Sequence, residues 1–180
     1  MSERHPIRGA QYRGKTSVDA DDLHIRLATT ADMDEVMRLA IAACEDNGFL
    51  DFSPALLAKE IWPALNQDHG IFAVIGPPSG EIQGFVLLRI GTMFYSEKLC
   101  VEEKCLWVHP EHRAARGGRA HKLLEFTKKT ADTLGLPLII GIMTTTRAAG
   151  KVKLYERMFG APTGAFFLYG AECGHAREVA

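Results

Sequence analysis

The sequence predicts a single domain of the α/β class, spanning residues 23–170 of the 180-residue chain. Leu23, Ile25 and Leu27 alternate with polar residues, which is the period of a half-buried strand. Further along, apolar residues recur at helical spacing, and residues 138–143 form a nearly continuous apolar run that is typical of a strand covered on both faces. Strands and helices therefore share one core, for which a chain of this length suffices.

The N-terminal half predicts one strand followed by two helices. Residues 1–22 carry many charges and no apolar period, so we expect a tail before the first strand. Apolar positions at a spacing of three or four residues then predict a helix over 33–44 that ends near Asn47. Ser53 supplies a helix cap and Pro54 suits the first helical position, so a second helix begins there.

The remaining elements follow in the order strand, strand, strand, helix, strand, helix, strand. A turn over 77–80 joins the first two of these strands, and Gly135 ends the first of the two helices. Residues 171–180 are expected to form a C-terminal tail. The expected ranges are 71–75, 82–90, 105–108, 120–134, 138–143, 147–159 and 165–169.

The segment after residue 105 is the most informative part of the chain. Its first residues, 106–110, predict the end of an apolar strand, and a turn rich in Arg and Gly follows before the helix at 120. This order leaves backbone N–H groups exposed at a helix N-terminus, beside several guanidinium groups. The segment therefore predicts a site for a ligand that carries phosphate.

Two motifs resemble those of the GNAT superfamily of N-acetyltransferases, and the resemblance covers about residues 23–170. The first motif is Val108-His109-Pro110 with the turn that follows it. Two alignments of this turn stay open. In one, residues 118–120 form the family's Gly-x-Gly/Ala element and Ala115 takes its Gln/Arg position. In the other, Arg113 takes the Arg position and Arg116 replaces the first Gly.

The second motif, over residues 151–160, resembles the family's helix that contains Leu-Tyr. Ala148 stands where the family often has Asn, and the Phe-Gly order at the end of the helix is reversed. These departures weaken the match of the loop before the helix, and they leave Tyr155 in the matching position.

The resemblance implies a GNAT-like fold with a mixed central sheet of six to seven strands flanked by about four helices. It implies an enzyme that uses acetyl-CoA as co-substrate and acetylates a primary amine of a small molecule or protein, by direct transfer in a ternary complex. Tyr155 would be the general acid for the leaving thiolate, and Glu103, or alternatively Glu102 or water alone, the base. The residues implied to bind acetyl-CoA are Leu106, Val108, Arg113, Arg116, Gly117, Gly118, Arg119 and Ala120.

Composition and charge exclude several other classes of protein. The formal net charge of −1 argues against a dedicated nucleic-acid binder, although basic residues are crowded between Arg113 and Lys129. The four cysteines form no CxxC pair and the seven histidines have no ligand spacing, so no metal site is expected. No apolar run is long enough to span a membrane and the N-terminus lacks the apolar core of a signal peptide, so a cytoplasmic location is expected.

Several questions about partners stay open at the level of the sequence. The alternative function is a non-catalytic GNAT-like module that binds CoA or a nucleic acid for regulation. Asp46 and Asp51 lie where the family shapes its acceptor site, and they are candidates to attract a cationic amine. The apolar segment 166–169 is a candidate for strand pairing across a homodimer.

Overall fold

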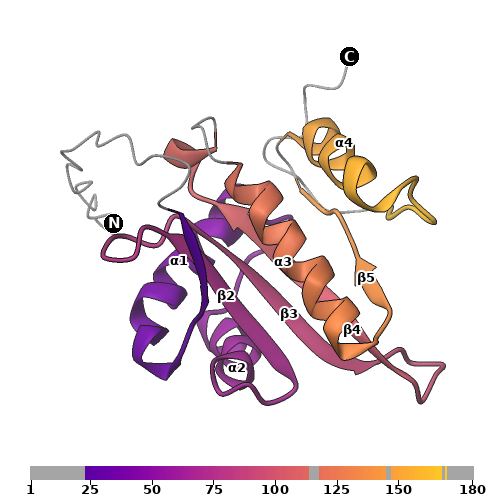
Figure 1. Cartoon of the computed structure of the whole chain (residues 1–180), viewed down its shortest axis with the longest axis horizontal. Helices are drawn as coiled ribbons and strands as arrows, with labels where there is room; N and C mark the ends of the chain where they lie inside the picture. The colour runs from indigo at the N-terminus through magenta and orange to yellow at the C-terminus, as the bar shows by residue number, and fades with distance from the viewer. Residues whose placement is uncertain (1–22, 114–117, 145–146, 168, 170–180) are drawn as a thin grey trace, which may run out of the picture.

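The sheet of the protein is mixed, as expected. A computed structural model describes residues 23–113, 118–144, 147–167 and 169, and Figure 1 shows its ribbon. Neighbouring strands from β1 to β4 are antiparallel, whereas β4 and β5 are parallel. In their order across the sheet, the strands are β1 (His24–Leu27), β2 (Gly70–Gly76), β3 (Gly84–Thr92), β4 (Leu99–Val108) and β5 (Leu138–Ile140).

Helices cover both faces of this sheet (Figure 1). One face packs against α1 (Met33–Asn47) and α2 (Pro54–Leu65), and the other packs against α3 (Arg119–Leu134). The helix α4 (Ala148–Phe159) lies beyond α3, on the side of β5. Because side chains of a strand alternate between faces, β2 and β3 supply two separate apolar clusters. Phe72, Val74, Phe85 and Leu87 face α1 and α2, while Ala73, Ile75, Val86 and Leu88 face α3.

Local sequence signals set the helix ends where the sequence predicted them. The hydroxyl oxygen of Ser53 accepts a hydrogen bond from the backbone N–H of Leu56 at 3.4 Å, and Pro54 is the first residue of α2. Gly135 adopts the left-handed conformation, with a φ of 64°, and its N–H caps the last turn of α3. Caps and proline positions therefore placed these two helices without any knowledge of their packing.

The described part of the chain does not form the predicted closing strand, and its sheet has fewer strands than the six to seven expected. The described residues contain five strands, and none of them lies within 165–169. The run 138–143 forms a strand only over its first three residues, which pair with residues 101–103 of β4. So short an outer edge offers little for a further strand to pair with, and Phe167 is 95% exposed. The described apolar residues of this segment therefore lie outside the sheet and largely exposed.

Some expectations fall on residues that the structure does not describe. They are the two tails, residues 1–22 and 171–180, and the centre of the Arg- and Gly-rich turn with Ala115, Arg116 and Gly117. Among the residues that are described, no helix combines the length and the apolar character needed to cross a bilayer.

Candidate active site

A gap between β4 and β5 forms the centre of the candidate site. The two strands pair only through Val101–Glu103 of β4 and Leu138–Ile140 of β5. Beyond Glu103, β4 continues to Val108 with β3 on one side, and no described strand pairs with its other edge. An unpaired edge of this kind presents backbone N–H and C=O groups to a ligand.

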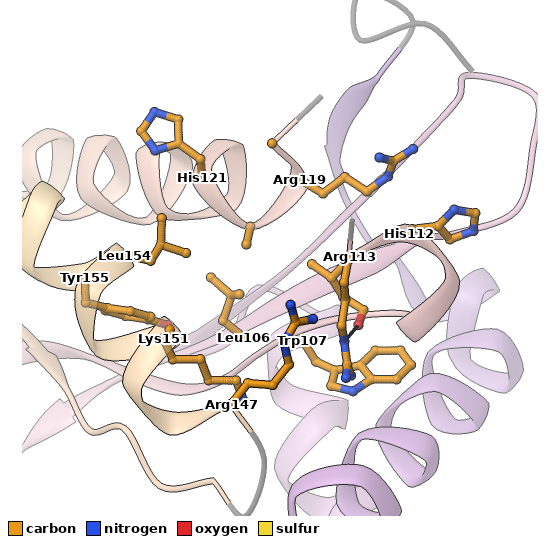
Figure 2. A pocket seen from close by; sticks show the side chains of 14 residues that line it. Leu106, Trp107, His112, Arg113, Arg119, His121, Arg147, Lys151, Leu154 and Tyr155 are labelled. Atoms are coloured by element: carbon orange, nitrogen blue, oxygen red, sulfur yellow. Dashed lines mark hydrogen bonds between the residues drawn. The ribbon is translucent and has the colours of Figure 1, made fainter. Parts of the chain in front are cut away.

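A cavity of about 320 Å³ lies at this free edge. Figure 2 shows that side chains from three directions enclose it: from β4 and the turn after it, from the first turn of α3, and from α4. All six of the described residues that the sequence implied for acetyl-CoA binding line the cavity, namely Leu106, Val108, Arg113, Gly118, Arg119 and Ala120. The other lining residues are Trp107, His112, His121, Arg147, Gly150, Lys151, Leu154 and Tyr155.

The N-terminus of α3 opens on this cavity. Gly118 precedes the helix in the left-handed conformation, with a φ of 56°, and no side chain caps the helix among the described residues. The first N–H groups of an α-helix have no partner within the helix, and their dipoles favour a negative charge. No acidic residue occupies this first turn, whereas Arg119 and His121 lie in it. The arrangement suits a phosphate group.

Arg119 is held in place by Gln83, the residue before β3. Its Nε donates a hydrogen bond to Oε1 of Gln83 at 2.7 Å, and only 4% of the residue is exposed. Burial lowers the pKa of the guanidinium, but a group that titrates so far above neutrality stays charged. A positive charge therefore stands fixed beside the N-terminus of α3.

Arg113 has a different set of partners from the one that the resemblance implied. Its Nε donates to the carbonyl of Val108 at 2.8 Å, and its terminal nitrogens form a salt bridge with the carboxylate of Asp46 at the end of α1. The guanidinium also lies over the indole of Trp107, 5.8 Å from the ring centroid. Arg113 therefore ties the turn after β4 to α1, although one side of it lines the cavity.

Asp46, Trp107 and Arg113 form a small cluster with Asp46 at its centre. It accepts a hydrogen bond from Nε1 of Trp107 at 2.9 Å as well as the bonds from Arg113. Burial opposes ionisation of Asp46, but the bonds from Arg113 and Trp107 outweigh it and lower the pKa of the carboxyl. Since its charge is matched within the protein, the expectation that Asp46 attracts a cationic amine loses its basis.

Glu103 and Tyr155 meet in the gap. The phenol of Tyr155 donates to Oε1 of Glu103 at 2.5 Å, whereas Oε2 is buried and has no hydrogen-bond partner among the described residues. Burial raises the pKa of Glu103 to about 7, against the opposing effects of the bond from Tyr155 and the charge of Lys151. Burial, followed by the charge of Glu103, raises the pKa of the phenol well above its usual value. A carboxyl that titrates near neutrality can take up and release a proton.

Glu102 faces away from this pair. Its carboxylate forms a salt bridge with Lys104 at 3.2 Å, and its side chain is 43% exposed. Adjacent residues of a strand point to opposite faces, so only one of the two glutamates reaches Tyr155. The sequence placed both residues just before the strand, but both belong to β4.

A second cavity, of about 70 Å³, lies on the other side of the gap. Leu106, Lys151 and Tyr155 line both cavities, so these three residues separate them. The residues that line the smaller cavity and not the larger one are Asn47, Glu103, Lys104, Cys105 and residues 141–143. Tyr155 therefore borders both cavities, whereas its partner Glu103 borders the smaller one.

The sequence did not single out Lys151 as a site residue. Its ammonium donates to Oδ1 of Asn47 at 2.8 Å and to the hydroxyl of Thr144 at 3.0 Å, and burial lowers its pKa. Lys151 precedes Tyr155 by four residues on α4, and residues at this spacing share a face of a helix. That spacing was the signal that could have found Lys151 once Tyr155 had been chosen.

The chain matches the family model described as the acetyltransferase (GNAT) family over residues 34–161, which is more than half of its length. It belongs to the GNAT acetyltransferase family. The match includes every element from α1 to α4, and so it contains both cavities of this GNAT protein.

Solved structures of GNAT proteins share the fold at low sequence identity. An aminoglycoside acetyltransferase from an uncultured soil metagenomic sample, in complex with sisomicin, has a TM-score of 0.57 at 21% identity, over 83% of this chain and 94% of that chain. The ribosomal-protein-alanine N-acetyltransferase from Brucella melitensis biovar Abortus 2308 has a TM-score of 0.60 at 18% identity, over 82% and 98%.

A third structure, AAC(6')-Iy in complex with the bisubstrate analogue CoA-S-monomethyl-acetylneamine, has a TM-score of 0.60 at 17% identity, over 84% of this chain and 99% of that chain. No curated protein matches the chain. At these identities, the likeness to solved structures concerns the fold.

Proposed function

We propose that the protein binds acetyl-CoA in the larger cavity and transfers its acetyl group directly to a primary amine in the smaller one. The observation that carries this proposal is the pair of cavities that meet at Leu106, Lys151 and Tyr155. A donor and an acceptor bound on the two sides of this junction would face each other. Such placement makes the reaction effectively unimolecular, which favours direct transfer in a ternary complex.

The larger cavity has the chemistry that acetyl-CoA requires. The diphosphate would bind to the N–H groups that follow Gly118, beside the fixed charge of Arg119. The pantetheine arm would run along the free edge of β4, past Leu106 and Val108. The structure of AAC(6')-Iy with a bisubstrate analogue of CoA supports the assignment by analogy of fold.

Glu103 and Tyr155 would together move the proton that the reaction releases. The amine nitrogen forms a bond to the acetyl carbon, the C–S bond breaks, and the electron pair of that bond leaves with the sulfur. Glu103 takes the proton that the amine loses, and Tyr155 gives its own proton to the thiolate. Since the phenol already bonds to Glu103, the proton on Glu103 can then restore Tyr155. No net proton is consumed within the site.

Protonation of Glu103 also prepares Tyr155 for its part. The ionised carboxylate raises the pKa of the phenol, so Tyr155 keeps its proton while Glu103 is charged. When Glu103 accepts the proton of the amine, this charge disappears and the phenol becomes a stronger acid. The order of the two transfers therefore follows from the contact between the two groups.

The proposal is tested by release of CoA thiol when acetyl-CoA is mixed with a panel of primary amines, together with calorimetric binding of acetyl-CoA. The variant pair Gly118→Glu and Gly135→Glu tests the site, because both glycines have positive φ at an end of α3 and only Gly118 lines the cavity. We expect Gly118→Glu to abolish binding and Gly135→Glu to retain it. Equal binding by both variants, or no thiol release with any amine, would contradict the proposal.

A further inference from the structure

The ammonium of Lys151 has no carboxylate partner among the described residues. Within the described part of the chain, its hydrogen bonds go to neutral oxygens, Oδ1 of Asn47 and the hydroxyl of Thr144, and it forms no salt bridge. An ammonium has three donors, so one N–H is left for another acceptor. Burial lowers the pKa of Lys151 even though the charges of Asp46 and Glu103 act in the opposite direction, so the half-buried ammonium has lost hydration that its present neighbours do not fully replace. Lys151 is therefore suited to bind an anionic group.

The position of Lys151 shows where that anion would lie. Its side chain extends from α4 into the site (Figure 2), and its ammonium reaches Asn47, the last residue of α1. It lines the smaller cavity together with Glu103. The two groups are close enough for the charge of each to act on the pKa of the other. One small space thus has a carboxyl for an amine and an ammonium for an anion.

From this pairing we infer that the acceptor is a small molecule that carries a carboxylate beside its primary amine, as an amino acid does. Lys151 binds the carboxylate, and Glu103 faces the amine. This inference rests on the proposed function, because it assigns the smaller cavity to the acceptor. The volume of about 70 Å³ agrees with a small head group, since pockets for drug-sized ligands begin at roughly 300 Å³.

The same charge disfavours polycationic acceptors. An ammonium in the cavity repels a second cation, and Asp46, the acidic residue nearest to the end of α1, is already matched by Arg113. Aminoglycosides and polyamines would therefore meet a positive group where they need a negative one. The acceptor class differs in this respect from the aminoglycosides that the name of one related structure gives as its substrates.

The experiment compares acceptors that differ only in the carboxylate. Thiol release from acetyl-CoA is measured with the twenty amino acids and β-alanine, with their carboxamides, and with spermidine and sisomicin. We expect kcat/KM for the preferred amino acid to exceed that for its amide by at least tenfold. Lys151→Met should remove this preference by reducing kcat/KM with the acid more than with the amide, and Lys153→Met, an exposed neighbour on α4, should retain it. Equal rates with acid and amide, or an unchanged preference in Lys151→Met, would overturn the inference.

A binding measurement separates this inference from the proposed function. N-acetylated amino acids and their amides are titrated into the CoA-loaded protein, and saturation-transfer NMR reports their binding without turnover. Binding of the acids by the wild type, with loss in Lys151→Met, supports the inference even if no thiol is released. Thiol release with amines alone and no binding of acids would leave the proposed function intact and overturn this assignment.

Discussion

The two ends of this domain are stabilised by different interactions. The largest fully buried side chains all lie between Val36 and Leu124, in the part that contains α1, α2, most of the sheet and the first half of α3. By contrast, α4 has no buried residue, and the residues of β5 are only half-buried. Among the described residues, side-chain hydrogen bonds link α4 to the rest: from Tyr155 to Glu103, and from Lys151 to Asn47 and Thr144.

This difference suggests that one part of the domain determines its stability and another part carries the reactive groups. Apolar burial supplies most of the free energy of folding, so the part before residue 134 should determine the stability of the domain. The contacts of α4 use groups that can also move protons or bind ions. Substitutions in the first part should therefore change the free energy of unfolding, and substitutions on α4 should change the reaction.

The largest effect on stability is expected from Phe72→Ala. Phe72 is 1% exposed and its ring stacks on Phe85 with 5.0 Å between the ring centroids, so its removal leaves a cavity in the core. We expect a loss of about 3–5 kcal/mol in the free energy of unfolding, measured by urea denaturation. Val152→Ala on α4 is the matched comparison, with an expected loss below about 1 kcal/mol. Similar losses in both variants would show that the two ends of the domain do not differ in this way.

Glu103→Gln should have the largest effect on the reaction. The amide keeps an oxygen that can accept the bond from Tyr155, but it cannot take a proton from the amine. We expect kcat/KM for thiol release to fall by about 10²-fold or more, because the variant lacks a general base. Glu102→Gln, whose side chain points to the other face of β4, is the control that should retain activity.

The pH dependence of stability gives an independent check on Glu103. Burial raises its pKa from 4.5 to about 7, so the folded protein retains a proton that the unfolded chain releases. The stability contributed by the protonated form is present below pH 4.5 and is lost as the pH rises through about 7. Glu103→Gln lacks this loss. Its free energy of unfolding should therefore rise relative to that of the wild type as the pH increases from 4.5 to about 7. Parallel curves would indicate that Glu103 is not buried as described.

Asp46→Asn should weaken the link between α1 and the turn after β4. The variant loses the charge that the guanidinium of Arg113 faces, while the indole of Trp107 can still donate to the amide oxygen. We expect a loss of about 1.5–3 kcal/mol in the free energy of unfolding and a higher KM for acetyl-CoA, since the turn borders the larger cavity. Glu45→Gln, an exposed neighbour on α1, should change neither quantity. An unchanged KM would limit the role of Asp46 to stability.

The cluster around Asp46 also shows what the sequence could and could not predict. Ser53, Pro54 and Gly135 marked helix ends through local rules, and the motif around Val108 led to the correct end of β4. Arg113 was implied as a phosphate ligand because the sequence of an Arg-rich turn does not show whether the fold places a carboxylate beside it. Its partner is 67 positions away in the sequence, and only the fold brings the two together.

The contact between Tyr155 and Glu103 and the predicted closing strand show the same limit of local sequence patterns. Tyr155 and Glu103 were both named from the family resemblance, but their hydrogen bond and the burial of Glu103 depend on how α4 packs beside β4. Lys151 reaches a residue 104 positions away, and no local pattern gives that contact. The closing strand failed for the opposite reason. Its local pattern suits a strand, but a strand also needs a partner edge, and a local pattern does not show whether one exists.

Tyr155→Phe should move the midpoint of the pH profile of the reaction, an effect smaller than the loss of rate expected for Glu103→Gln. Glu103 must be ionised to act as base, so the rate should fall as the pH drops through about 7. The bond from Tyr155 and the charge of Lys151 lower the pKa of Glu103, and Cys105 beside it is a thiol whose pKa burial raises. Without the phenol, the pKa of Glu103 should rise, and the fall in rate should begin at a higher pH. A profile that keeps its midpoint would contradict the contact between the two groups.

The smallest effect on the free energy of unfolding is expected from Phe167→Ser, a substitution in the exposed C-terminal part of the domain. Phe167 is 95% exposed, so its removal takes almost no apolar surface out of a core. We expect the free energy of unfolding to change by no more than about 0.5 kcal/mol, in contrast to Phe72→Ala. Sedimentation of the variant and the wild type tests the prediction that segment 166–169 pairs across a homodimer. A dimer that dissociates in Phe167→Ser would show that a second copy supplies the partner that this segment lacks within one chain, and the segment would then belong with the stabilised part of the molecule.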